Sequence, residues 1–144
     1  MKILISACLL GIACRYDGKS KEYNGIRMLM ERHQLIPVCP ECYGGLPTPR
    51  PPAERQGDRV CTQAGMDVTA QYEKGAREAL KLAEQFGCTW AILKEKSPSC
   101  GSGEIYDGTF SRSIIPGDGI TAALLKENGI RVVGERQLDL LPEE

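Results

Sequence analysis

Short apolar runs alternate with helical patterns along this chain, and this alternation limits the possible folds more than any other feature. Apolar runs typical of buried strands occur at residues 2–7, 35–38, 89–94 and 130–135. Apolar residues at helical spacing lie between them, over residues 26–33, 69–86 and 117–129. Strands joined through helices form right-handed β-α-β units, which build a parallel sheet. We therefore predict an α/β fold over residues 1–144: a single three-layer domain with a small, mostly parallel sheet and long loops at the carboxyl ends of the strands.

Boundary residues and turn residues refine this prediction. The helix over 69–86 is expected to start at an N-cap, either Asp67 or Thr69, and to stop before Gly87. Residues 40–58 are so rich in Pro and Gly that we predict one long loop, and loops of this length in compact domains are usually functional or disordered. Residues 103–111 predict a small β-hairpin that turns at its Asp-Gly pair.

The charges of the chain are balanced, with 18 Lys and Arg residues against 19 Asp and Glu residues. Bulk charge therefore gives no reason to expect a membrane surface or a polyphosphate partner. A nucleic-acid partner is not expected either, because whole-tRNA binding normally requires a basic stripe. The N-terminal apolar stretch leads into a polar turn rather than a cleavage site, and no segment approaches the roughly 20 apolar residues of a membrane span. We expect a cytoplasmic protein.

The cysteines are the residues most in need of an explanation. The chain contains seven of them: Cys8, Cys14, Cys39, Cys42, Cys61, Cys88 and Cys100. An odd number without a signal peptide argues against a disulfide framework, which leaves metal binding, catalysis or burial.

The predicted topology separates these cysteines. Cys8 lies at the carboxyl end of the first strand, Cys39 at that of the second, and Cys100 a few residues beyond the third. Open α/β sheets bind their ligands at this edge, so three strands bring three thiols to the place where a site is expected. Cys88 lies just before a strand, at the opposite edge, and is predicted to be a small buried hydrophobe or a surface bystander.

Three soft thiolates favour an iron–sulfur cluster over zinc, because zinc would usually recruit histidine. The only histidine, His33, lies at the end of a predicted helix. A cluster that needs four ligands and receives three keeps one iron open, and an open iron can act as a Lewis acid toward a substrate.

Two other cysteines leave alternatives open. Cys14 or Cys42 could join the metal site and close it, which would give a binding module, stabilised by zinc or a closed cluster, without catalysis. Cys39 and Cys42 also form a C-P-E-C sequence, a spacing that suits a thiol redox protein or a persulfide carrier.

Several motifs, taken together, closely resemble the DUF523 family, whose characterised branch is the thiouracil desulfidases. The motifs are SACLLG at 6–11, CRYDG at 14–18, PVCPE at 37–41, GGLPTPRPPAE at 44–54, SPSCG at 97–101, IYDGTFS at 105–111 and GDGITAALL at 117–125. The similarity extends over essentially the whole chain.

This resemblance implies both a cofactor and a reaction. The cofactor is a 4Fe-4S cluster held by Cys8, Cys39 and Cys100, with one open iron that takes the sulfur of a thiolated pyrimidine such as 2-thiouracil. The family's catalytic acidic residue maps to Glu41, and its catalytic serine maps to the SPSCG loop. That serine is therefore Ser97 or Ser99. The expected reaction is a non-redox desulfuration, in which hydrosulfide is released or handed to a sulfur acceptor.

Charged residues in the same loops have no assigned role. Arg15, Asp17, Arg50 and Glu54 are as well suited to pinning loops through salt bridges as to binding a substrate.

Overall fold

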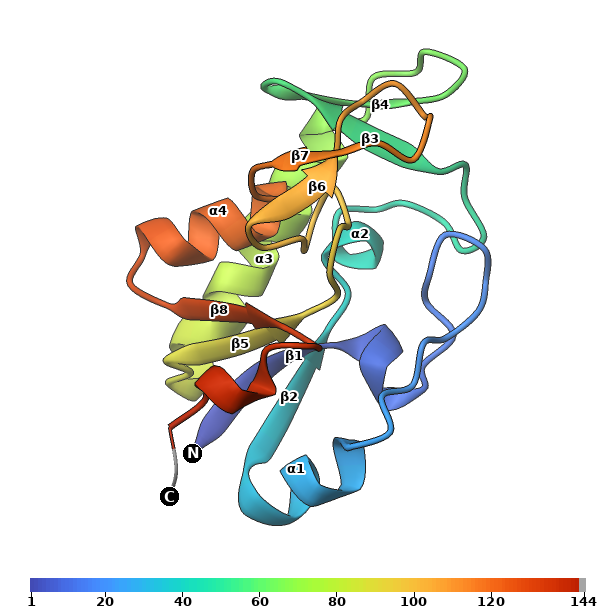
Figure 1. Cartoon of the computed structure of the whole chain (residues 1–144). Coiled ribbons are helices and arrows are strands. Elements are labelled where there is room, and N and C mark those ends of the chain that lie inside the picture. Colours follow the sequence, from blue (N-terminus) through green and yellow to red (C-terminus); the bar gives the residue numbers. More distant parts are fainter. Residues whose placement is uncertain (143–144) are drawn as a thin grey trace.

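A four-stranded sheet forms the centre of the computed structural model, which describes residues 1–142 (Figure 1). The strands, in spatial order, are β2 (Gln34–Val38), β1 (Lys2–Ser6), β5 (Trp90–Leu93) and β8 (Arg131–Gly134). Every neighbouring pair is parallel. The strands are rich in buried aliphatic residues, as expected for a parallel sheet covered on both faces. The predicted α/β class with a mostly parallel sheet is confirmed.

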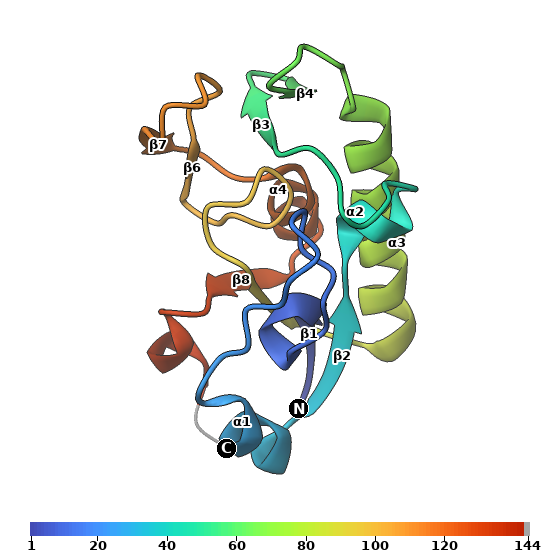
Figure 2. The same cartoon turned by 90° about the vertical axis from the view of Figure 1, so that its right-hand side faces the viewer.

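Helices cover both faces of the sheet and produce three layers (Figures 1 and 2). One face carries α3 (Thr69–Phe86) and α4 (Ile120–Glu127); the other carries α1 (Ile26–Arg32) and the 3₁₀ helices η1 (Ala7–Leu10) and η2 (Leu138–Leu140). Successive residues of a strand point to opposite faces. Leu4 of β1 therefore packs with α3 and α4, whereas Ile3 and Ile5 pack with α1 and η1.

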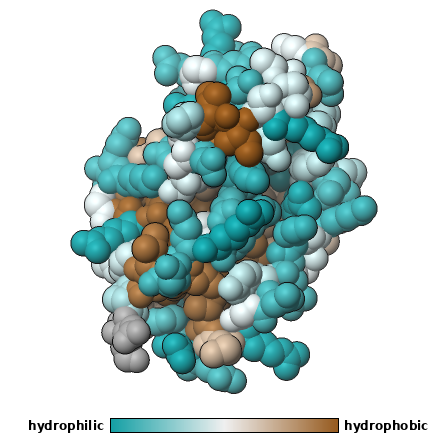
Figure 3. Space-filling model, viewed as in Figure 1, coloured by the Kyte–Doolittle hydropathy of each residue, from teal (hydrophilic) through white to brown (hydrophobic). Residues whose placement is uncertain are grey.

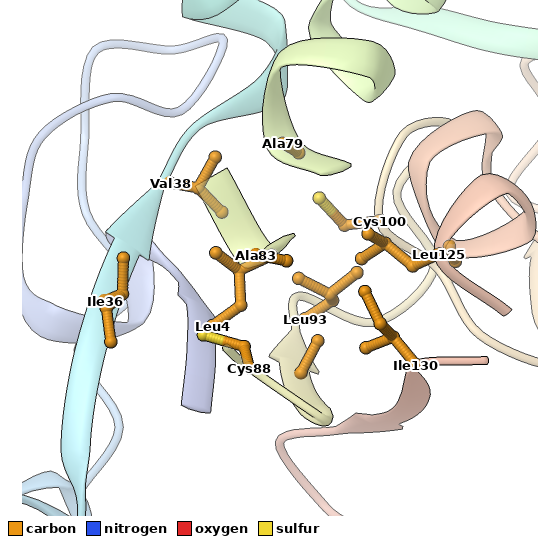
Figure 4. Packing of buried hydrophobic residues seen from close by; sticks show 12 residues of the cluster. Leu4, Ile36, Val38, Ala79, Ala83, Cys88, Leu93, Cys100, Leu125 and Ile130 are labelled. Atoms are coloured by element: carbon orange, nitrogen blue, oxygen red, sulfur yellow. The ribbon is translucent and has the colours of Figure 1, made fainter. Parts of the chain in front are cut away.

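The core between the sheet and α3 is closely packed (Figure 4). Leu4 and Val38 of the sheet belong to the same buried cluster as Ala79 and Ala83 of α3. Small residues on α3 let this helix approach the sheet closely. Cys88 lies in this cluster and is 6% exposed, so the prediction that it behaves as a small buried hydrophobe is confirmed.

The stretch at 40–58 is not one long loop, and that prediction is wrong. It contains a short helix, α2 (Pro40–Tyr43), and a strand, β3 (Ala53–Gln56), which pairs with β4 (Arg59–Thr62) in an antiparallel ribbon. Pro40 is tolerated in the first turn of a helix, where its missing N–H has no partner to lose. The partner strand follows β3 after only two residues, Gly57 and Asp58, so the Pro and Gly content of residues 40–58 masked a short local hairpin.

Two glycines allow α2 to lie directly against α3. A Cβ atom on Gly44 would collide with the backbone oxygen of Gln71, and one on Gly75 would collide with the backbone oxygen of Pro40. Only glycine permits this close approach of two backbones. The contact fixes the position of α2 and of Cys39, the residue that precedes it.

The predicted hairpin at 103–111 exists, but it is wider than expected. Its strands are β6 (Glu104–Tyr106) and β7 (Ile114–Pro116), and the connecting loop is 107–113 rather than a two-residue turn. The Asp107 N–H donates to the carbonyl of Ser113, which closes the wide loop at its base.

The face shown in Figure 3 is mostly polar, with apolar atoms gathered over the β6–β7 hairpin and around η2. The exposed apolar residues of these elements include Ile114, Ile115 and Leu140. Within residues 1–142, no helix combines the length and the apolar character that crossing a membrane requires.

Candidate functional site

A cavity of about 620 Å³ opens at the carboxyl ends of the central strands. In Figure 1 the ends of β1, β2 and β5 converge below α2 and the β6–β7 hairpin. Ser6, Val38 and Lys94, at or next to the ends of these three strands, line the cavity. The two small hairpins add residues from outside the sheet. Ligands bind at this edge in open α/β folds, as the sequence predicted.

The three predicted ligand cysteines all line this cavity. Cys8 lies in η1, directly after β1; Cys39 lies between β2 and α2; and Cys100 lies in the loop after β5. Cys8 and Cys100 are buried and Cys39 is half-buried, and all three are free thiols. Residues more than 90 positions apart in the sequence are thus brought to one cavity by the parallel topology of the sheet.

Cys14 adds a fourth thiol to the lining. Its side chain is hydrogen-bonded to the thiols of both Cys8 and Cys39. The Cys39 thiol also points at the backbone carbonyl of Cys14, with 3.7 Å between sulfur and oxygen. The polar turn after η1 therefore folds back over the ends of β1 and β2, which the sequence could not show.

Cys42 has a different environment. It does not belong to the cavity lining. Its sulfur lies 3.5 Å from the hydroxyl of Thr48 and 3.9 Å from Nη1 of Arg50, both in the loop that follows α2. Its sulfur also lies 4.0 Å from the carbonyl oxygen of Cys14, which the Cys39 thiol contacts as well, so Cys42 borders the cavity without belonging to its lining.

The thiols of Cys14, Cys39 and Cys100 have raised pKa values and stay protonated at neutral pH. Burial is the main cause for Cys100. It raises the pKa of Cys100 to about 12, and the charge of Glu41 adds to the effect. The hydrogen bond with Cys14, followed by burial, raises the pKa of Cys39. For Cys14, the hydrogen bond from Cys39 lowers the pKa, but the bond with Cys8 and burial outweigh it and raise the value to about 11. A metal that binds here must therefore displace protons.

Glu41 lies in the first turn of α2 and lines the cavity. The guanidinium of Arg50, which is buried, donates a 2.9 Å hydrogen bond from Nε to the Glu41 carboxylate. Its Nη2 donates to the carbonyl of Cys14 at 2.9 Å, and its Nη1 donates to Thr48 at 3.0 Å. One guanidinium thus fixes the carboxylate relative to the loop that carries Cys14.

Sequence reasoning missed Tyr72, which also lines the cavity and is hydrogen-bonded to Glu41. Burial, together with the nearby carboxylate, raises the pKa of this phenol, so its hydroxyl is protonated and acts as the donor. The helical spacing indicated an apolar face, and Tyr72 is indeed buried there. The contact with Glu41 comes from the packing of α2 on α3, and no local pattern encodes it.

The two candidate serines of the SPSCG loop have different surroundings. Ser97 lines the cavity, and its Oγ accepts hydrogen bonds from the backbone N–H groups of Ser99 and Cys100, both at 3.1 Å. Ser99 is fully buried outside the lining, and its hydroxyl is 2.8 Å from that of Thr121. Ser97 thus lies in the lining with the thiols and Glu41, whereas Ser99 lies behind the lining, where its side chain contacts the Cys100 thiol.

The charged loop residues without an assigned role hold the loops in place, and three of them also line the cavity: Arg15, Arg50 and Glu54. Arg50 pairs with Glu41, as described above. Glu54 is buried and accepts hydrogen bonds from two backbone N–H groups of the β6–β7 loop. Arg15 lies 3.9 Å from Asp17 and also lines the cavity, whereas Asp17 does not.

The chemistry of the donors in the cavity suits an iron–sulfur cluster. Among residues 1–142, no three Cys, His, Asp or Glu side chains lie close enough together to hold one metal ion. The cavity offers thiols and no histidine, and thiolates are the usual ligands of iron–sulfur clusters.

Comparison with known proteins agrees with this chemistry. The family model described as 2-thiouracil desulfurase matches residues 3–137. A Bacillus subtilis (strain 168) protein named "Uncharacterized protein YbbK" is 46% identical over 147 residues, which cover 95% of this chain and 97% of the relative. A solved structure of the [4Fe-4S]-dependent thiouracil desulfidase TudS (DUF523Vcz) superimposes with a TM-score of 0.91 at 52% identity, over 96% of this chain and 93% of that one.

Proposed function

This chain belongs to the 2-thiouracil desulfurase family, and from that we propose that it is a thiouracil desulfidase that depends on a 4Fe-4S cluster. The reaction replaces the sulfur of a thiolated pyrimidine, such as 2-thiouracil as a base or nucleoside, with oxygen. Water is consumed and hydrosulfide is released or passed to an acceptor. The atoms balance without any oxidant, reductant or nucleotide.

We assign the cluster to Cys8, Cys39 and Cys100. One observation carries the proposal: three thiols from three different strand ends line the same cavity as Glu41 and Ser97. When bound, a cluster with an iron free of protein ligands supplies a Lewis acid for the thiocarbonyl sulfur.

The side chains of the cavity supply the rest of the chemistry. Glu41 holds a water molecule and removes its proton as the oxygen adds to the carbon that carries the sulfur. Arg50 and Tyr72 both bind the Glu41 carboxylate, so this base has a fixed orientation before the substrate arrives. The Ser97 hydroxyl lies in the same cavity and orients the ring or carries a proton between the water and the product.

Cys14 and Cys42 are not ligands in this assignment. Cys42 lies outside the lining and interacts with Thr48 and Arg50. Cys14 lies in the lining, where its hydrogen bonds to the Cys8 and Cys39 thiols suit a neighbour that supports the ligands. Seven free cysteines also suit a reducing compartment, and we place the protein in the cytoplasm.

Cysteine variants test this assignment. After anaerobic purification and reconstitution, the protein should contain four irons per chain, absorb broadly in the visible region and release hydrosulfide from 2-thiouracil. Cys8→Ser, Cys39→Ser and Cys100→Ser should each lose most of the iron and all of the activity. Cys61→Ser is the matched control, because this cysteine is half-buried on β4 and does not line the cavity.

Three outcomes would contradict the proposal. Loss of iron from Cys14→Ser or Cys42→Ser would indicate a fourth protein ligand and a closed site. Zinc in place of iron would indicate a structural metal. A reconstituted cluster without hydrosulfide release would indicate a binding or redox protein.

A further inference from the structure

The unusual backbone conformations of this protein gather around the cavity. Within residues 1–142, three residues other than glycine have a positive φ: Lys96 at 67°, Phe110 at 60° and Arg112 at 64°. All three line the cavity. L-residues rarely adopt this region because the Cβ atom crowds the backbone, and it persists only where surrounding contacts impose it. The contacts around the cavity therefore hold the backbone in unfavourable conformations at positions that line it.

The contacts that hold the backbone at a positive φ are clearest at Phe110. The buried carboxylate of Glu54 accepts hydrogen bonds from the N–H of Phe110 at 3.2 Å and from that of Gly108 at 3.0 Å. Gln56 donates to the carbonyl of Gly108 at 2.9 Å. A Cβ atom on Gly108 would lie 2.7 Å from the Gln56 side chain, so only glycine fits there. Two residues of strand β3 thereby fix the backbone of the β6–β7 loop at Gly108 and Phe110.

The aromatic side chains of the lining are not equivalent. Tyr72 is bound to Glu41, and Tyr16 is largely exposed, with the Arg15 guanidinium over its ring. Tyr106 belongs to strand β6. Phe110 has no polar group to satisfy, is half-buried, and comes from a hairpin outside the sheet that delivers the thiols. The thiols and Phe110 thus line the same cavity from different elements, the central sheet and the β6–β7 hairpin.

We propose that Phe110 is a specificity-determining residue whose ring stacks on the pyrimidine ring of the substrate, and that Glu54 is the residue that positions it. The inference rests on the proposed function, because it takes a flat, aromatic thiolated pyrimidine as the substrate. An aromatic side chain binds such a ring through its π face, and an aliphatic side chain of similar size lacks that face. Stacking also fixes the plane in which the thiocarbonyl lies, which a reaction at one ring carbon requires.

Two substrates separate stacking from general packing. 2-Thiouracil is planar and aromatic, whereas its 5,6-dihydro form keeps the same thiocarbonyl between two nitrogens and loses the aromatic ring. In cluster-loaded protein, Phe110→Leu should lower kcat/KM for 2-thiouracil about tenfold to a hundredfold, mainly through KM, and should affect the dihydro compound much less. Phe110→Tyr should retain the preference for the aromatic ring. Equal losses on both substrates, or a loss in Tyr106→Leu instead, would overturn the proposal.

A double-mutant cycle tests the part played by Glu54. If Glu54 acts through Phe110, Glu54→Ala should raise KM for 2-thiouracil in the wild-type background and have little further effect in Phe110→Leu. Glu54→Gln keeps an acceptor for the two N–H groups and should largely restore KM. Additive effects on KM would overturn this part of the proposal, because they would mean that Glu54, which itself lines the cavity, acts independently of Phe110.

A binding measurement separates failure of this inference from failure of the proposed function. Equilibrium dialysis of radiolabelled uracil against cluster-loaded protein requires no turnover. Phe110→Leu should weaken uracil binding about tenfold, whereas Phe110→Tyr should not, even if no hydrosulfide were ever released. Unchanged uracil binding in Phe110→Leu, with the visible spectrum intact, would refute the stacking role alone.

Discussion

The Nε atom of Arg50 lies 2.9 Å from Oε2 of Glu41, and both side chains are withdrawn from solvent, with 4% of Arg50 and 15% of Glu41 exposed. The same guanidinium also holds the carbonyl of Cys14. A single buried cation therefore connects the proposed base to a loop that contributes a thiol to the cavity.

Arg50→Met should destabilise the protein and disable the site. Removing one partner of a buried ion pair leaves the other charge uncompensated, which costs about 3 to 5 kcal/mol of unfolding free energy. Turnover of 2-thiouracil should fall by at least about tenfold because Glu41 loses its orientation. Arg50→Lys keeps the charge but loses the planar set of guanidinium donors. Its stability and turnover should lie between those of Arg50→Met and wild type.

The control for this change is Arg15→Met, because Arg15 also lines the cavity but its pairing with Asp17 is long and partly exposed. Its unfolding free energy should stay within about 0.5 kcal/mol of wild type. Similar stabilities for Arg50→Met and Arg15→Met in urea unfolding would show that the Glu41 pair contributes nothing.

Gly75→Ala should separate α2 from α3. The added Cβ would collide with the carbonyl oxygen of Pro40, so the helices must move apart, at a cost of about 1 to 3 kcal/mol of unfolding free energy. Alanine has a higher helix propensity than glycine, so the same substitution at an exposed helix position would raise the unfolding free energy. Lys74→Ala, one residue earlier and exposed, is the control. A Gly75→Ala protein as stable as wild type would contradict the close contact.

The two loop serines should have separable effects. Ser97→Ala should lower kcat about a hundredfold, because its hydroxyl lies in the cavity with Glu41. Ser99→Ala should instead cost about 1 to 3 kcal/mol of stability, because the buried hydroxyl of Thr121 loses its partner. Steady-state kinetics and thermal unfolding of both variants check this. A lower kcat in Ser99→Ala with an unchanged kcat in Ser97→Ala would assign the catalytic role to Ser99 instead.

Glu135 should make stability depend on acid pH. Burial alone would raise its pKa, but hydrogen bonds from the Lys94 ammonium and the Glu95 N–H outweigh burial and lower it from 4.5. The folded chain thus binds this proton less readily than the unfolded chain. The resulting stabilisation is present above pH 4.5 and is lost as the pH falls through the lower folded value.

Glu135→Gln is the matching variant. It should be about 1 to 2 kcal/mol less stable than wild type at neutral pH, and the difference should shrink below pH 4.5 in urea unfolding of the cluster-free protein. Glu73→Gln, at an exposed position of α3, is the control and should stay within about 0.5 kcal/mol of wild type at neutral pH. A constant difference between Glu135→Gln and wild type at every pH would contradict the pKa shift.

The central sheet could be predicted because its information is local. Apolar runs such as residues 2–7 have the length and composition of buried strands, and the helices between them dictate parallel pairing. The errors lie where a high Pro and Gly content hides a short hairpin or where backbones touch. Strand β3 requires β4, and α2 requires two glycines against α3. The composition of residues 40–58 indicates a loop because its Pro and Gly content masks the turn at Gly57 and Asp58, and because the backbone that α2 packs on belongs to α3.

Only part of the candidate site, too, could be predicted from the sequence. The convergence of Cys8, Cys39 and Cys100 on one cavity follows from strand order alone, since carboxyl ends of parallel strands share an edge. The contact of Cys14 with two of these thiols depends on the path of a loop, and the bond between Tyr72 and Glu41 depends on helix packing. No periodicity in the sequence carries that information.

Water must supply the oxygen that replaces sulfur if Glu41 activates a water molecule in this cavity. Anaerobic, cluster-loaded protein is incubated with 2-thiouracil in water enriched in the heavy oxygen isotope, without any electron donor or acceptor, and the uracil and hydrosulfide are quantified. We predict one heavy oxygen in each uracil and one hydrosulfide for each uracil formed. Uracil without the heavy isotope, or turnover that requires an added oxidant or reductant, would contradict a hydrolytic desulfuration at this site.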